Sequence, residues 1–86
     1  MLTEQYLWRH EPMVSDDPIQ LVTSYLQEFQ DDEVIEAAVY KLNNNKYLSI
    51  CYMGCSVIEY SGHTEYEEFD RIEDALTSFH NYIEGN

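Results

Sequence analysis

The apolar positions of the chain follow a helical period at first and an alternating one later. After Asp16 and Asp17, apolar side chains recur every three or four residues, at Ile19, Val22, Leu26 and Phe29. The aspartates can cap a helix, and Pro18 suits a first helical turn, where its missing N–H group costs nothing. The pattern therefore predicts a helix over residues 18–30, which ends near Asp31 and Asp32, where the period changes.

The middle of the chain is rich in β-branched, small and aromatic residues, broken by turn-forming residues, and this predicts three antiparallel strands. The first covers residues 33–42, with Ile35, Ala37 and Val39 on one side and Glu36 on the other. Three asparagines at 43–45 predict a turn, and residues 46–53 form the second strand. We read Gly54 as the next reversal, residues 56–61 as the third strand and residues 61–64 as a loop.

A second helix is predicted near the C-terminus. Asp70 and Glu73 have the spacing of a capping box, and Gly85 can act as the C-cap. Between these positions the apolar residues recur at helical spacing, at Ile72, Leu76, Phe79 and Ile83. Residues 1–14 fit a short helix and an added strand equally well.

These elements predict one α+β domain over residues 1–86. Its expected architecture is a three-stranded antiparallel meander with two helices packed on one face, in the order α-β-β-β-α. The helical stripes are expected to cover a single apolar sheet face made by Ile35, Val39, Leu48, Ile50 and Ile58. With 44% of residues hydrophobic and eight tyrosines, the chain has the composition of a folded domain and not of a disordered acidic tail.

The charge of the chain narrows its function. Seventeen Asp and Glu residues stand against four Lys and Arg residues, which gives a formal net charge of −13. Such a surface repels nucleic acid and anionic membranes, so we expect neither to bind and the natural partner to be basic. The sequence starts with no charged and apolar leader and has no apolar run of roughly 20 residues, so we expect a cytoplasmic protein.

Two groups of acidic residues are the predicted partner-binding surface. Ordinary surfaces mix both signs of charge, whereas no basic residue lies between Arg9 and Lys41. Closely spaced carboxylates on a rigid frame can imitate a phosphate backbone, and a tyrosine among them can receive Arg or Lys. The first group is Glu28, Asp31, Asp32, Glu33 and Glu36, and the second is Glu65, Glu67, Glu68, Asp70, Glu73 and Asp74, with Tyr66 as an aromatic anchor. The alternative is that both groups are solubilising surface.

Other chemistry has little support in the sequence. Cys51, Cys55 and His63 could meet a zinc ion, but the two cysteines have no second ligand pair at zinc-site spacing. A nucleophilic cysteine needs an electropositive setting, which this chain lacks. There is no calcium loop and no phosphate-binding glycine loop. We therefore expect no catalytic residues, no metal and no cofactor, and we do not expect an enzyme.

In size and charge the chain resembles the small acidic DNA-mimic inhibitors of phages and mobile elements, and the immunity proteins that neutralise nuclease toxins. No motif carries this resemblance, so it assigns no residues. It implies a monomer or small homo-oligomer that occupies the basic site of a nuclease, a CRISPR effector or a DNA-binding protein. The alternative function is a structural or regulatory module that self-associates through its sheet face, with the acidity serving solubility.

Overall fold

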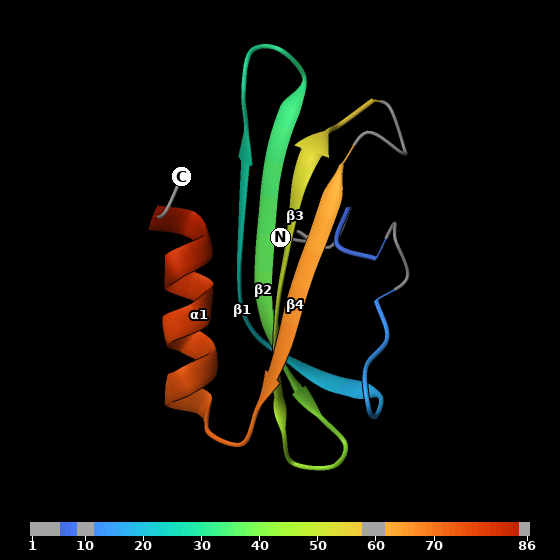
Figure 1. Ribbon diagram of the computed structural model, residues 1–86, viewed down its shortest axis with the longest axis vertical. Helices are drawn as coiled ribbons and strands as arrows, with labels where there is room; N and C mark the ends of the chain where they lie inside the picture. The colour runs from blue at the N-terminus through green and yellow to red at the C-terminus, as the bar shows by residue number, and fades with distance from the viewer. Residues whose placement is uncertain (1–5, 9–11, 58–61, 85–86) are drawn as a thin grey trace.

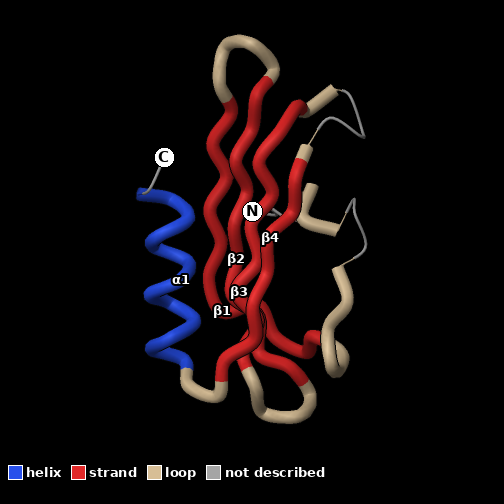
Figure 2. The backbone as a smooth tube through the Cα atoms, viewed as in Figure 1, coloured by secondary structure: helices blue, strands red, loops and turns tan. Residues whose placement is uncertain are grey.

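The computed structural model describes residues 6–8, 12–57 and 62–84 of the 86-residue chain. Within these residues the fold is one four-stranded antiparallel sheet followed by a helix (Figures 1 and 2). The elements are β1 (Pro18–Glu28), β2 (Glu33–Leu42), β3 (Tyr47–Cys55), β4 (His63–Phe69) and α1 (Ile72–Glu84). The strands lie in the order β1-β2-β3-β4, so the sheet is a simple meander. The predicted α-β-β-β-α fold is therefore wrong, because the described residues form four strands and one helix.

The segment predicted as the first helix is strand β1. Its apolar spacing looks helical because the strand contains register shifts between Pro18 and Gln20 and between Leu21 and Thr23. An extra residue at a bulge breaks the two-residue alternation, so Val22 and Tyr25, three residues apart, pack on the same side. The ends of the presumed helical stripe, Ile19 and Phe29, are exposed. The stripe is thus a consequence of a bulged strand, which is also rich in β-branched and aromatic residues.

Strand β2 confirms the predicted strand over residues 33–42, but β3 continues past the expected reversal at Gly54. Gly54 is needed for close packing and not for a turn. A Cβ atom there would overlap the Cα atom of Gly62, and a Cβ atom at Gly62 would overlap the ring of Tyr52. The Tyr52 hydroxyl also donates a hydrogen bond to the Cys55 carbonyl (3.2 Å). Two glycines therefore allow the chain to close around one buried tyrosine.

The last strand, β4, comprises residues that the sequence pattern assigned partly to a loop. The predicted third strand at 56–61 is wrong where it can be seen: residues 56 and 57 follow β3 outside any strand, and residues 58–61 lie outside the described part. Strand β4 contains three glutamates, which are depleted in strands, alongside Thr64, Tyr66 and Phe69. The backbone pairing with β3 holds these residues in an extended strand, which their own sequence does not predict.

The predicted second helix is confirmed as α1, and it covers one face of the sheet. Ala75 and Phe79 are its buried residues, and they pack against Ala37, Val39 and Cys51 of the central strands. The predicted C-cap, Gly85, lies outside the described residues. The helix has its main contacts with β2, β3 and β4, and Val22 and Tyr25 of β1 pack against the same apolar cluster.

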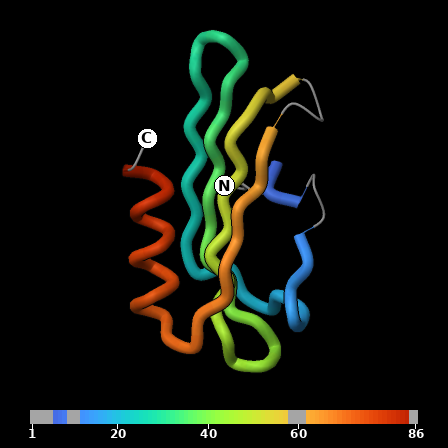
Figure 3. The backbone as a smooth tube through the Cα atoms, viewed as in Figure 1, coloured from blue at the N-terminus to red at the C-terminus, as the bar shows by residue number. Residues whose placement is uncertain are grey.

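The opposite face of the sheet is covered by the N-terminal segment (Figure 3). The described residues of the first fourteen are neither helix nor strand; Tyr6–Trp8 form a turn. Leu7 is fully buried, Tyr6 stacks on Tyr52 with ring centroids 5.9 Å apart, and Trp8 packs on Tyr40. The core thus has two sides, and the predicted one-sided core is wrong because Leu48 and Ile50 face the N-terminal segment while Ile35 and Val39 face α1.

Candidate acidic interface

One of the predicted partner-binding acids is part of the core. Glu36 faces the N-terminal segment and has no exposed surface. Its Oε1 atom accepts hydrogen bonds from the backbone N–H groups of Tyr6 (2.7 Å) and Leu7 (3.1 Å). A buried carboxylate is tolerated where hydrogen bonds compensate for the lost hydration. Glu36 therefore holds the N-terminal turn on the sheet, and it cannot reach a partner.

Two further predicted residues, Tyr66 and Glu68, also hold the N-terminal segment. The hydroxyl of Tyr66 accepts a hydrogen bond from the N–H group of Met13 (3.1 Å). The carboxylate of Glu68 accepts one from the N–H group of Ser15 (2.7 Å) and another from the Ser15 hydroxyl. Both side chains lie on the same sheet face as Glu36, because they pair with Ile50 and Leu48 of that face. Their first role is internal, although Tyr66 remains 40% exposed.

The other glutamates of β4 lie on the face that α1 covers. Glu65 and Glu67 pair with Cys51 and Ser49, and both are exposed. An open groove of about 360 Å³ runs between this strand and the helix, and it is lined by Glu67, Phe69, Asp74, Thr77, Ser78 and Asn81. The fold thus joins acidic residues of β4 and α1, as the sequence grouping predicts. We call Glu67 and Asp74, which line the groove, and Glu65, which precedes Glu67 on the same face of β4, the groove acids.

The electrostatics around the groove follow from this arrangement. Burial, and more weakly the nearby charges of Glu65 and Glu67, raise the pKa of the Tyr82 hydroxyl, although a hydrogen bond with Ser78 opposes this. At the start of α1, a hydrogen bond to its own backbone N–H and the adjacent Arg71 lower the pKa of Glu73. Arg71 Nε lies 3.5 Å from Glu73 Oε1 and His63 Nε2 lies 3.3 Å from Glu65 Oε2, both at exposed positions. Exposed pairs of this kind are weak, so the groove stays anionic.

The first acidic group, without Glu36, lies at the turn between β1 and β2. We call Glu28, Asp31, Asp32 and Glu33 the hairpin acids, and all four are exposed. Asp32 has a left-handed backbone (φ 63°), and its carbonyl accepts hydrogen bonds from the N–H (2.7 Å) and hydroxyl (3.1 Å) of Ser56. The described basic residues all lie at the other end of the sheet, where β4 leads into α1: Lys41, Lys46 and Arg71. Asp70, Glu73 and Asp74 share that end, so the two acidic groups are separate surfaces.

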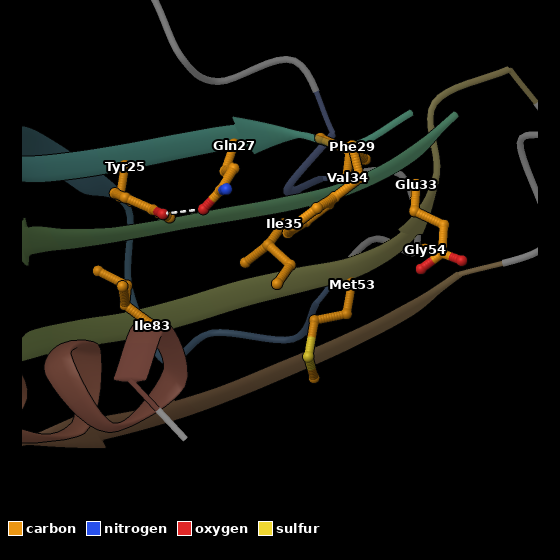
Figure 4. A pocket seen from close by; sticks show the side chains of 9 residues that line it. All are labelled: Tyr25, Gln27, Phe29, Glu33, Val34, Ile35, Met53, Gly54 and Ile83. Atoms are coloured by element: carbon orange, nitrogen blue, oxygen red, sulfur yellow. Dashed lines mark hydrogen bonds between the residues drawn. The ribbon is translucent and has the colours of Figure 1, made fainter. Parts of the chain in front are cut away.

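Beside the hairpin, the sheet has a cavity that the sequence pattern does not predict. Its volume is about 530 Å³, and its lining includes Tyr25, Phe29, Ile35, Met53 and Ile83. In Figure 4 the side chains of Ile35 and Met53 from the sheet and Ile83 from α1 surround it, and Tyr25 donates a hydrogen bond to Gln27. The cavity opens between the β1–β2 hairpin end of the sheet and the C-terminal end of α1, where Ile83 borders it. Only a correct assignment of β1 as a strand could have revealed it.

The candidate zinc ligands are not brought together. Cys51 is buried beneath α1, and burial, with a smaller effect from Glu65, raises the pKa of its thiol to about 12. A thiol that stays protonated at neutral pH is a poor nucleophile and a poor metal ligand. Cys55 ends the same strand, and His63 pairs with Met53. In the described ranges no three His, Cys, Asp or Glu side chains are placed to hold a metal ion.

Comparison with models of protein families, with curated proteins and with solved structures finds no match for this chain. Over residues 6–8, 12–57 and 62–84, no helix has the length and apolar character that crossing a membrane requires. Function therefore has to be argued from the acidic surfaces themselves.

Proposed function

We propose that this protein is an acidic inhibitor that occupies the basic nucleic-acid-binding site of a partner protein in the cytoplasm. The partner is a nuclease, a CRISPR effector or a DNA-binding protein, and the protein itself binds neither nucleic acid nor membrane. The observation that carries the proposal is the groove between β4 and α1, to which two separate elements contribute Glu67 and Asp74. Phage inhibitors and toxin immunity proteins would use the same physical device.

The groove suits a lysine or arginine side chain. Its acids attract the charged head, and the ring of Phe69 offers an apolar surface for the methylene stem. Thr77, Ser78 and Asn81 provide hydrogen-bonding groups along the helix. Glu65 and Glu67 are two residues apart on one strand face, so roughly 6.6 Å separates their positions along the strand. A rigid row of such charges can replace the phosphates that a basic site normally holds.

The experiment is competition for a basic partner. The protein is immobilised, a lysate of the source organism is passed over it, and bound proteins are eluted at rising salt. A captured nucleic-acid-binding protein is then purified, and its binding of labelled duplex DNA is measured against added inhibitor. We expect the inhibitor to displace the DNA, to show no DNA binding of its own at physiological salt, and to lose affinity as salt screens the contacts.

Charge reversal tests which surface is responsible. Replacing the groove acids with lysine (Glu65→Lys, Glu67→Lys and Asp74→Lys together) should slow association and weaken binding by several kcal/mol. Stability should change little or rise, because the reversal relieves repulsion within the fold. The same reversal at three hairpin acids (Asp31→Lys, Asp32→Lys and Glu33→Lys together) tests the other acidic surface with an equal change in charge. If both triple variants bind and inhibit like the parent, the acids serve only solubility and the proposal is wrong.

A further inference from the structure

The two edges of the sheet differ in charge. Strand β1 pairs only with β2, and β4 only with β3, so each presents an open backbone edge within the described sheet. Strand β4 carries three glutamates, whereas β1 has no charged side chain from Pro18 to Gln27 and only Glu28 at its end. Natural proteins commonly protect an edge with charges, because an open edge is a template for another strand. In a chain of net charge −13, β1 lacks that protection.

The two ends of β1 are poorly covered, whereas residues 22–26 between them are half-buried. Ile19 and Leu21 are 58% and 42% exposed, and Phe29, just after the strand, is 44% exposed. On one face, the first half of β1 borders an open groove of about 310 Å³ shared with Trp8 and Tyr40. On the other, its second half borders the larger cavity of Figure 4. Exposed apolar side chains therefore flank the open backbone of this edge at both ends.

We propose that two copies of the protein associate through β1, with the strands antiparallel, to form one continuous eight-stranded sheet. An antiparallel strand pair between identical chains has two-fold symmetry, so one edge is complementary to itself. A two-fold axis near Tyr25 would set Glu28 opposite Val22 of the other copy, so no carboxylates would face each other in the pair. Pairing through β4 would instead bring glutamates together, and a basic foreign strand would favour β4. The uncharged edge of β1 therefore favours pairing with the β1 strand of a second copy.

The shape of β1 restricts where the pairing occurs. Its register shifts lie in the first half, before Thr23, and bulges hinder strand addition. The pairing is therefore centred on the regular part, from Thr23 to Glu28. The two-fold axis of such a sheet is perpendicular to it, so both copies of α1 lie on one face and both β4 edges point outward. The groove acids remain free, and the dimer is thus an addition to the proposed function that does not depend on it.

Dimerisation and binding of a basic partner should depend on salt concentration in opposite directions. Each copy is strongly anionic, and Asp16 and Asp17 precede β1, so the two copies repel at low ionic strength. Screening this repulsion should strengthen the dimer as salt rises. Binding of a basic partner by the groove acids should weaken under the same change. The failure of one proposal can therefore be recognised without affecting the other.

The test is the mass of the pure full-length protein in solution. Sedimentation velocity and light scattering at rising concentration should show a shift from 10.2 kDa to twice that mass, at lower concentration when salt is added. Hydrogen exchange should show the amides of β1 becoming protected as the dimer forms, while those of β4 stay unchanged. A mass that stays at 10.2 kDa throughout, or protection on β4 and not on β1, would overturn the proposal.

Two variants of equal net charge make the test specific. Ser24→Lys places two lysines near the two-fold axis and should raise the dimer dissociation constant about tenfold or more. Glu67→Gln changes the net charge by the same amount on the opposite edge and should leave the constant unchanged or lower it. If Ser24→Lys does not fold by circular dichroism, Gln27→Lys replaces it, at an exposed position of the regular part of β1 and with the same change in net charge, again with a weaker dimer expected. Equal weakening by Glu67→Gln would contradict pairing through β1.

Discussion

The two faces of the sheet are closed in different ways. On one face an amphipathic helix, α1, buries Ala75 and Phe79, and the contact is apolar. On the other face an irregular segment buries Tyr6 and Leu7, and its backbone is anchored by side chains of the sheet, of which Glu36 is the most buried. A helix satisfies most of its own backbone groups, whereas an irregular segment needs partners for them. Some of the acidity of this chain therefore serves the fold.

The largest effects should come from removing the main apolar contact on each face. Phe79→Ala should destabilise the protein by about 3–5 kcal/mol, and Leu7→Ala by about 2–5 kcal/mol, because each leaves a cavity in a close-packed core. For so small a domain either loss is a large share of total stability. The free energy of unfolding in urea measures both. A near-zero effect of Leu7→Ala would show that only the helical face belongs to the cooperative core.

A smaller effect is expected from the anchoring carboxylate. Glu36→Gln keeps a similar shape and an acceptor oxygen but replaces charge-assisted hydrogen bonds with neutral ones, and should cost about 1–3 kcal/mol. Amide exchange of Tyr6 and Leu7 should become faster than exchange in α1. The matched control, Glu33→Gln on the exposed hairpin, should stay within about 0.5 kcal/mol of the parent. Equal effects of the two variants would remove the distinction between structural and surface acids.

The smallest effect at neutral pH concerns the thiol beneath the helical face. The pKa of Cys51 is raised from 9.0 to about 12, so the folded state favours the neutral thiol. The stability that this group contributes is complete below pH 9 and is lost as the pH rises toward 12. At neutral pH a thiol reagent should modify Cys55 and leave Cys51 unmodified until the protein unfolds. Rapid labelling of Cys51 in the native state would mean that α1 does not seal this face.

The helical face was the more predictable of the two. The capping spacing and apolar period of residues 70–83 predicted α1, and a run of β-branched and small residues predicted β2. Strand β1 was mistaken for a helix because a bulge around Val22 changes its period. Strand β4 was missed because its glutamates are poor strand formers, and its order comes from pairing with β3.

The acidic residues of the candidate site also differ in how far the sequence could predict their roles. Exposed acids that are close in sequence, such as Asp31 and Asp32, could be identified directly. The anchoring role of Glu36 could not, because its partners lie 29 and 30 residues away in a segment without regular structure. Glu68 is 53 residues from Ser15, and sequence spacing gives no sign of that contact. Local patterns therefore identify acidic groups, but only the tertiary fold separates anchors from free charges.

The turn between β1 and β2 has a consequence for recognition. Its backbone is fixed although its side chains are exposed, since Ser56 holds the Asp32 carbonyl through two hydrogen bonds and the Phe29 N–H group donates to the Glu33 carbonyl (2.8 Å). A loop that is already ordered loses little conformational entropy on binding. The hairpin acids are thus preorganised, so a basic molecule that meets this turn finds its charges already in place.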